Sequence, residues 1–398
     1  MKDLQKMSPV ELKSCSILAS VYALRMLGMF LILPIFAIYA TNLDSNPTSL
    51  QIGLALGIYG LTQAIFQIPF GMSSDYFGRK KVIYFGLLLF IIGSLIAGYS
   101  TSIEGIILGR SIQGSGAISA VLTALLADIT REEQRTKAMA IIGASIGLTF
   151  ALSLVLSPWL NDVIGVDGIF ILMAILSFTA FLLVYFFIKE PEIRKEKTKT
   201  SADEFLKILK DINLFRMNFG IFVLHATQIS MFMIIPIYLV NQGGINLSDH
   251  WQIYLPVLFF SFLLMIPIII FSEKFNKIKI AFLSSIIILF VAQLVFIIFG
   301  NTLFGIILAL LIYFVGFNFL EASLPSLVSK IAPINKKGLA LGVYNTSQSL
   351  GIFVGGALGG LITKVYGYNA SFVFCIALIF LWFVLSLGMQ VVNYKKAN

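Results

Sequence analysis

Two side chains that can exchange a proton stand inside long apolar stretches of the sequence: His225, in FVLHATQIS, and Glu321, in VGFNFLEASLP. Loss of water disfavours the charged form of a carboxylate, and an imidazole titrates near physiological pH. The two residues are therefore candidates for a site that binds and releases a proton. The alternatives are a carboxylate paired permanently with an arginine and a histidine bonded to a neighbouring carbonyl group.

Two arginines, Arg25 and Arg110, also lie inside apolar stretches. An arginine at the centre of a membrane helix costs about 2.5–3.5 kcal/mol on insertion scales, so it usually faces protein or a cavity. Arg110 could instead be held by backbone carbonyl groups for rigidity. Arg25 could bind a substrate or Glu321, and the sequence leaves both possibilities open.

The composition places these residues in a membrane protein. Of 398 residues, 58% are hydrophobic and 12% are charged, whereas a soluble chain has about 25% charged residues. Cys15 and Cys375 both lie in apolar runs and indicate neither a disulfide framework nor a metal site. The sequence shows no nucleophile–base pair, metal-ligand cluster or phosphate-binding loop, so we expect no enzyme activity and no metal or cofactor.

Long apolar runs between polar breaks predict the architecture. A bilayer core is crossed by about 20 apolar residues in a helix. The sequence therefore predicts an all-α protein with twelve membrane-spanning helices, at residues 15–40, 50–73, 82–99, 104–127, 138–160, 168–188, 215–240, 251–271, 280–299, 303–328, 339–362 and 370–391.

The positions of the basic residues predict the orientation. All of the 28 lysines and arginines except Arg25, Arg110 and Lys364 lie in the two tails or in alternate loops. The opposite loops carry acidic residues instead, namely Asp44, Glu104, Asp162, Asp167 and Asp249. Cytoplasmic loops are enriched in Lys and Arg, so both termini are predicted to be cytoplasmic. The net charge of +9 is thus explained by topology, and we do not expect a nucleic-acid partner.

The longest polar stretch divides the chain into an N-terminal six-helix bundle (1–188), a cytoplasmic linker (189–214) and a C-terminal six-helix bundle (215–398). Ser201 and Glu204 form a capping-box pattern at the start of a helix within the linker. One face of that helix would carry apolar side chains, which predicts a helix lying on the inner membrane surface; a solvated linker is the alternative. The face consists of Phe205, Ile208, Leu209, Ile212 and Phe215.

The two halves also resemble each other in sequence. MFLILP (29–34) aligns with MFMIIP (231–236), PFGMSSDYFGRK with PIIIFSEKFNKI, and DITREEQRTKAMA with KIAPINKKGLALG, in the same order and at nearly one offset. Because six spans is an even number, both copies would enter the membrane in the same direction. This is the parallel-repeat arrangement, in which a substrate binds between the halves near the middle of the bilayer.

The stretch GMSSDYFGRKK (71–81) resembles the loop signature between spans 2 and 3 of the major facilitator superfamily. The matching positions are Gly71, Asp75, Gly78, Arg79 and Lys80, while Tyr76 stands where a basic residue is usual. LGRSIQGSG resembles the span-4 motif of the family, with Arg110, Gln113 and Gly114 in place. LRMLGMFLILP, GIYGLTQAIFQIPFG, ILGRSIQGSGAISA and REEQRTKAMA resemble the YajR-like group of bacterial drug–proton antiporters.

The resemblance implies a bacterial inner-membrane transporter that works by alternating access, exports small amphipathic molecules and takes up protons in exchange. It also implies that Arg110 influences proton binding, because a nearby cation favours the charged form of a carboxylate. One departure concerns span 5, where antiporters of this family commonly carry a Gly-Pro pair. Here Gly147 is followed by Leu148, and the proline comes later, at Pro158.

The loop signature has separable parts. Gly78 permits a turn with positive φ, and Lys80 holds the loop on the cytoplasmic side. Asp75 is expected at the start of span 11, where unpaired N–H groups favour a carboxylate. Arg79 could reach Asp128 at the inner end of span 4, and Arg135 follows in the next loop. The family resemblance implies that such a charge relay latches the two halves together when the inner gate is shut.

Polar and aromatic residues on the spans are candidates for lining a substrate cavity, although each could instead form an interhelical hydrogen bond. They are Tyr59, Gln63, Gln67, Gln113, Asn318, Tyr344, Asn345 and Gln348. The function predicted first is proton-coupled export of an amphipathic compound by a monomer, driven by the proton gradient. The alternatives are uptake of a small organic anion, which would balance the two buried arginines, and a non-transporting membrane sensor with the same fold.

Overall fold

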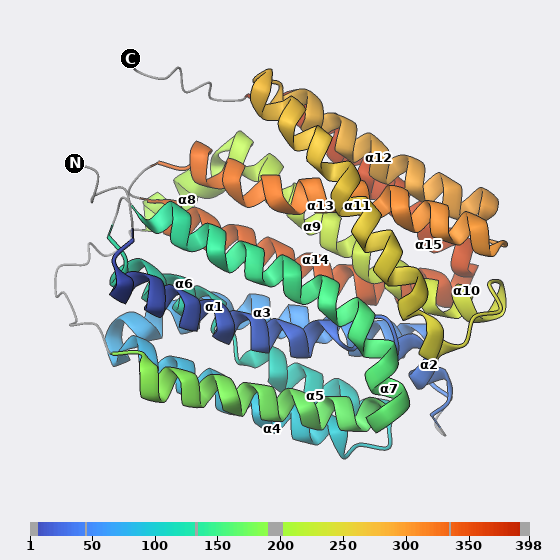
Figure 1. Ribbon diagram of the computed structural model, residues 1–398, viewed down its shortest axis with the longest axis horizontal. Coiled ribbons are helices and arrows are strands. Elements are labelled where there is room, and N and C mark those ends of the chain that lie inside the picture. The colour runs from blue at the N-terminus through green and yellow to red at the C-terminus, as the bar shows by residue number, and fades with distance from the viewer. Residues whose placement is uncertain (1–6, 44–45, 132–133, 190–201, 334–335, 391–398) are drawn as a thin grey trace. The chain divides into compact units, whose positions relative to one another are not determined.

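The structure is a computed structural model that describes residues 7–43, 46–131, 134–189, 202–333 and 336–390. The described residues form helices joined by short turns, with no β-strand among them (Figure 1). The chain divides into two compact units, residues 1–198 and 199–398.

The helices of the first unit are α1 (Pro9–Phe30), α2 (Phe36–Thr41), α3 (Ser49–Phe77), α4 (Arg79–Gly98), α5 (Ile103–Ser115), α6 (Ser119–Ile129) and α7 (Arg135–Phe187). Those of the second unit are α8 (Ala202–Lys210), α9 (Ile212–Phe232), α10 (Ile235–Asn241), the 3-10 turn η3 (Leu247–Asp249), α11 (Trp251–Lys274), α12 (Ile278–Phe299), α13 (Leu303–Ile331), α14 (Lys337–Tyr366) and α15 (Tyr368–Leu387).

These helices account for all twelve predicted spans. Ten helical stretches in the described part of the chain are long and apolar enough to cross a membrane. The stretch within α7 contains two of the predicted spans, because Gly165 has non-helical backbone angles (φ 68°, ψ 174°) and separates them. The remaining span, predicted at 15–40, is divided between α1 and α2. The protein is therefore all-α, as predicted.

The structure corrects the continuity of three spans. The first is interrupted at 31–35, the fourth at 116–118 and the seventh at 233–234. The first and seventh interruptions fall at equivalent positions of the sequence repeat. Pro34 lies within the first, and Pro236 is the second residue of the helix that follows the seventh. Proline lacks an N–H group and disfavours helical angles at the residue before it. A backbone carbonyl freed at the first interruption, that of Leu31, accepts a hydrogen bond from the Ser157 hydroxyl of α7.

Each unit has its own apolar interior. In the first unit, buried side chains of α1, α4, α6 and α7 form one cluster that includes Leu18, Leu87, Leu122 and Val184, and α7 packs along both α1 and α4 (Figure 1). In the second unit, α14 lies against α9, and α12 packs between α13 and α15. Trp382 of α15 is fully buried and contacts Phe282 of α12.

The predicted linker helix is present in part. Residues 190–201, and with them Ser201 of the predicted capping box, lie outside the described residues, as does the side chain of Glu204. The helix ends at Lys210, where Asp211 caps the next helix by accepting hydrogen bonds from the N–H groups of Asn213 and Leu214. The predicted apolar face is thus divided between α8 and α9, and its position on a membrane surface stays a prediction.

Candidate functional sites

His225, Glu321 and Gln348 meet within the second unit, although they come from α9, α13 and α14. The Nε2 atom of His225 lies 3.3 Å from Glu321 Oε2 and 2.7 Å from the side-chain nitrogen of Gln348. The His225 side chain is 4% exposed, whereas that of Glu321 is 30% exposed. The imidazole therefore lies behind the carboxylate, and the carboxylate is the more accessible of the two.

The geometry makes the proton positions of these three groups depend on one another. When Nε2 carries a proton, it can donate to Glu321, and the amide of Gln348 must then present its oxygen. When Nε2 carries no proton, it accepts a hydrogen bond from the Gln348 amide and leaves the carboxylate without that donor. One ring nitrogen thus serves both neighbours, and a proton gained or lost there changes both contacts.

Close packing of α9 against α14 brings His225 and Gln348 together. A Cβ atom on Gly351 would lie 2.2 Å from the carbonyl oxygen of Phe222, and one on Gly355 would lie 2.3 Å from that of Ala226. Only glycine allows backbones this close. His225 lies between these two contact points along α9, and Gln348 lies one turn before Gly351 on α14.

Arg25 is fully buried in the first unit and is bonded to neutral groups. It donates hydrogen bonds to the Ser119 hydroxyl (2.8 Å), the Tyr59 hydroxyl (2.8 Å) and the Gly116 carbonyl (3.2 Å). Gly116 belongs to the interruption between α5 and α6, and its carbonyl group accepts hydrogen bonds from both Arg25 and the Ile118 backbone N–H (2.8 Å). Its Nε atom has no hydrogen-bond partner among the described residues.

Arg110 is likewise buried among neutral groups, as one of the sequence-based alternatives predicted. It donates to the backbone carbonyl groups of Ala55 (3.3 Å) and Leu56 (3.4 Å) and to the side chain of Gln113 (3.0 Å). The guanidinium also lies 5.0 Å from the centre of the Tyr59 ring. These bonds connect α5 to α3, and Gln113 extends them to Ser94 of α4 by a hydrogen bond of 2.7 Å.

The other cavity candidates fall into two groups. The side chains of Tyr59, Gln113 and Asn318 form interhelical hydrogen bonds, and Asn318 donates to Ser261 of α11 (3.0 Å). The remaining four form no side-chain hydrogen bond with any described residue; they are Gln63, Gln67, Tyr344 and Asn345. Gln67 is 1% exposed, with both amide atoms unpartnered among those residues. A cavity role for these residues stays a prediction.

A charge cluster lies at the junction of α3 and α4. Arg79 contacts Asp75 at 2.6 Å and Asp128 of α6 at 2.9 Å, and it donates to the Ser74 hydroxyl at 2.5 Å. The Arg79 side chain is 7% exposed, compared with 50% for Asp75. The predicted Arg79–Asp128 contact is therefore present, and Ser74 is a further partner that sequence reasoning did not single out.

The sequence predicted a loop between the spans at 50–73 and 82–99, whereas helix occupies nearly all of that interval. The α3 helix continues to Phe77, and α4 begins at Arg79, so Gly78 alone separates them, with φ 99° and ψ 149°. Lys80 donates to the carbonyl group of Ile188 at 2.7 Å. Gly71, inside α3, faces Ala120 of α6. A Cβ atom on Gly71 would lie 3.7 Å from the Ala120 Cβ atom, an ordinary contact distance.

Arg135 is bonded at the same end of α6 that carries Asp128. Its guanidinium donates to the backbone carbonyl group of Ala127 at 3.2 Å, at the cytoplasm-facing end predicted for span 4. The expected meeting of Asp75 with the start of span 11 joins the two units, so it stays a prediction.

The equivalent junction in the second unit, between α11 and α12, forms the turn with asparagine in place of glycine. Asn276 is the equivalent of Gly78 and has φ 52°, a left-handed conformation that asparagine tolerates better than most residues. Glu273 and Lys277 form no ion pair among the described residues, and Lys277 instead lies 6.0 Å from the centre of the Phe271 ring. The alignment of Gly78 with Asn276, two residue types that tolerate positive φ, is the sequence signal for this shared conformation.

Sequence reasoning also missed an ion pair between Glu11 and Arg131. Glu11 accepts from the Arg131 backbone N–H (2.9 Å) and from its guanidinium (3.0 and 2.9 Å). It also forms a capping box with Ser8. Hydrogen bonds from Arg131 hold the pKa of Glu11 at about 2, well below its usual value. The Ser-x-x-Glu spacing at 8–11 was the available signal for the cap.

The number and apolar length of the described helices indicate a multi-pass membrane protein, and comparison with known proteins identifies it as a transporter. A family model described as Major Facilitator Superfamily matches residues 18–356, and again 271–397. The inner membrane transport protein YajR of Escherichia coli K12 is 41% identical over 394 residues, covering 98% of this chain and 86% of YajR. The chain therefore belongs to the major facilitator superfamily.

Two more distant matches extend the comparison. Multidrug resistance protein 2 of Bacillus subtilis is 26% identical over 404 residues, covering 94% of this chain and 93% of that protein. Among solved structures, a bacterial homologue of the human lysosomal transporter Spinster, inward-facing and occupied, superposes with a TM-score of 0.76. The superposition covers 96% of this chain and 97% of the homologue. Because the two sequences are only 12% identical, it supports the fold alone.

Proposed function

We propose that the protein exports small amphipathic organic compounds in exchange for protons, with His225 and Glu321 as the proton-binding pair. The observation that carries this proposal is the 3.3 Å contact between the two side chains, deep within α9 and α13. Glu321 lies ten residues before the end of α13, a distance of about 15 Å along the helix axis. An ionisable pair at such depth is costly unless it has a function.

The proton would bind to the accessible carboxylate and be shared with the imidazole behind it. When both groups are neutral, the cost of exposing the site to an apolar environment falls. When the carboxylate is ionised, a protonated His225 compensates its charge. These two arrangements hold the same proton, and the pair has no net charge in either. Release of that proton would leave an ionised Glu321 beside a neutral His225, so the empty site would carry one negative charge and the loaded site none. Such a difference in charge would let proton binding bias the conformational equilibrium.

Sequence similarity supports the choice of substrate class and location. The similarity to a multidrug resistance protein favours an amphipathic organic substrate, and the 41% identity to an inner membrane transport protein favours the bacterial inner membrane. The distribution of basic residues supports a cytoplasmic location for both termini. On this orientation the Asp75–Arg79–Asp128 cluster lies at the cytoplasmic face, where it would latch the inner gate.

The test uses inverted membrane vesicles and ethidium, a fluorescent amphipathic cation, as the probe substrate. An imposed pH gradient, acidic inside, should drive ethidium into vesicles that contain the protein, and a protonophore should abolish its accumulation. Vesicles without the protein provide the background. If a panel of amphipathic compounds moves no protons across the membrane in either direction, the antiport proposal is wrong.

One observation favours an anionic substrate as the second candidate. Both buried arginines, Arg25 and Arg110, are bonded to neutral groups, with no carboxylate within 4.0 Å among the described residues. A substrate anion reaching the free Nε of Arg25 would balance this charge. Proton-coupled accumulation of an organic anion that is lost in Arg25→Gln, with no movement of cations, would favour this candidate.

A further inference from the structure

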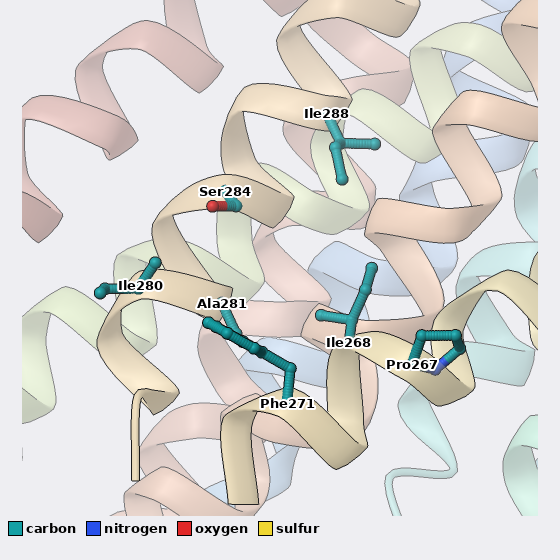
Figure 2. A pocket seen from close by; sticks show the side chains of 7 residues that line it. All are labelled: Pro267, Ile268, Phe271, Ile280, Ala281, Ser284 and Ile288. Carbon is teal, nitrogen blue, oxygen red and sulfur yellow. The ribbon is translucent and has the colours of Figure 1, made fainter. Parts of the chain in front are cut away.

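An apolar cavity of about 290 Å³ lies between α11 and α12 in the second unit (Figure 2). It is separate from the His225–Glu321 pair, which belongs to other helices. The residues that line it are Pro267, Ile268 and Phe271 of α11 and Ile280, Ala281, Ser284 and Ile288 of α12. Figure 2 shows the Phe271 ring extending from α11 toward α12, beside Ala281. Of the lining side chains, only that of Ser284 is polar.

The cavity exists because α12 turns small side chains toward α11. Ala281 and Ser284 are spaced three residues apart and so share one face of the helix. The α12 helix packs mainly against α13 and α15 and only lightly against α11. The lining residues of α12 extend from Ile280 to Ile288, about 12 Å along the helix axis. The result is a groove whose walls, Phe271 and Ile280, are themselves exposed at 39% and 50%.

Positive charge gathers at one end of this groove. Lys274 ends α11, and Lys277 and Lys279 surround the start of α12. The Lys277 ammonium lies 6.0 Å from the centre of the Phe271 ring, which lines the groove. Among the described residues no carboxylate lies within 4.0 Å of these three ammonium groups, so their charge is available to an external anion.

We propose that this groove binds one acyl chain of an anionic phospholipid, with the lipid phosphate held by Lys277 and its lysine neighbours. The apolar lining matches a hydrocarbon chain, which needs no polar anchor, and the lysines complement the charge of the headgroup. The volume is near the lower limit of ligand pockets and suits one chain rather than a whole lipid. The lipid comes from the leaflet that faces the α11–α12 turn.

Native mass spectrometry tests the proposal with the full chain and two probe lipids, phosphatidylglycerol and phosphatidylethanolamine. The protein is released from micelles that contain equal amounts of both, and the retained lipid is counted. We expect one phosphatidylglycerol to be retained preferentially. Ser284→Phe, which fills the groove, should lower its retention by about tenfold, since excluding two methylene groups from an apolar site has that effect. Ile298→Phe, on an exposed part of the same helix, is the matched control and should retain the lipid.

A second pair of variants tests the headgroup contact without altering the groove. Lys277→Gln should lower phosphatidylglycerol retention by about fivefold, the share expected from one lysine near an anionic lipid. It should leave phosphatidylethanolamine unaffected, and Lys364→Gln, a lysine of α14 at the predicted opposite face, should change neither. Equal retention of both lipids by the wild type, or full phosphatidylglycerol retention by Ser284→Phe, would overturn the proposal.

A photoactivatable phosphatidylglycerol with a diazirine at the end of one acyl chain locates the bound chain directly. Crosslinks are expected in peptides that contain Ala281, Ser284 or Ile288, and Ser284→Phe should remove them while Ile298→Phe leaves them. Crosslinks spread evenly over the exposed faces of α11, α12 and α15 would show an unspecific lipid shell instead, and the proposal would fail.

Discussion

At the scale of single residues, Glu11 shows how one carboxylate can fasten two distant segments. It receives three hydrogen bonds from Arg131 and one from the Ser8 backbone, and it is 6% exposed. These contacts connect the start of α1 with the turn after α6. Since the carboxylate accepts hydrogen bonds from both segments, we expect it to contribute to the stability of the first unit.

Glu11→Gln should lower the free energy of unfolding by about 1.5–3 kcal/mol, the value of hydrogen bonds to a charged group. Thermal unfolding in detergent measures it, with Glu104→Gln as the control, because Glu104 is an exposed acid that accepts one bond from Gln51. An unfolding temperature equal to that of the wild type would show that the pair does not contribute.

The same residue predicts a pH dependence. Because the pKa of Glu11 is lowered from 4.5 to about 2 in the folded protein, its contribution is complete above the unfolded value and is lost as the pH falls from about 4.5 toward 2. The stability difference between the wild type and Glu11→Gln should therefore shrink over this interval. Unfolding temperatures that fall in parallel for both proteins would contradict the assignment.

Backbone conformation at the two helix junctions gives a third prediction at this scale. Gly78 has φ 99° and Asn276 has φ 52°. Gly78→Ala should destabilise the protein by about 1–3 kcal/mol, because the new side chain must adopt a conformation that is sparsely populated. Asn276→Gly keeps the required freedom and should leave the unfolding temperature within error of the wild type; a clear loss would mean that the Asn276 side chain itself is needed.

At the scale of the elements, the contact between α9 and α14 positions the proton-binding candidates. Gly355→Ala would put a Cβ atom 2.3 Å from the Ala226 carbonyl oxygen, so the helices must move apart at a cost of about 1–3 kcal/mol. We expect a lower unfolding temperature and a weaker His225–Gln348 contact. Gly143→Ala is the control, since a Cβ there meets no described atom within 4 Å; equal behaviour of the two variants would contradict a packing role for Gly355.

The extent of each span could be predicted from the sequence, but its continuity could not. Length and hydropathy are properties of the residues themselves. They located every span, although the first helix begins at Pro9, earlier than the predicted start at 15. The interruptions depend on surroundings, because proline alone does not cause them. Pro34 lies within a break and Pro236 just after one, whereas five other prolines lie inside helices, namely Pro69, Pro158, Pro256, Pro267 and Pro325. A break persists only where other groups satisfy the freed backbone, as Ser157 does for Leu31.

For the candidate sites, too, the sequence predicted one part and not another. Ionisable residues in apolar runs can be recognised because their burial is costly, and this identified Arg25, Arg110, His225 and Glu321. Their partners come from helices far apart in the sequence and depend on the register of packing. Gln348, for example, was a candidate for lining a substrate cavity or for an interhelical hydrogen bond, and its contact with His225 of α9 agrees with the second. Among the described residues, Glu321 pairs with His225 and not with an arginine.

At the scale of the whole molecule, the Arg79 cluster is proposed to act as a latch. Asp75 is 50% exposed while its partner Arg79 is 7% exposed, so its loss should cost little stability. Asp75→Asn is expected to insert and fold normally but to transport slowly or not at all. Transport rate and unfolding temperature should be measured together, and full transport activity in Asp75→Asn would count against the latch.

The most direct test of proton coupling compares two transport modes of Glu321→Gln, whose amide imitates a carboxyl group that stays protonated. In proteoliposomes the variant should retain exchange of labelled for unlabelled substrate, because exchange needs no net proton movement. It should lose accumulation driven by an imposed pH gradient, whereas the wild type shows both. Accumulation driven by the pH gradient at the wild-type level in Glu321→Gln would contradict a coupling role for this carboxylate.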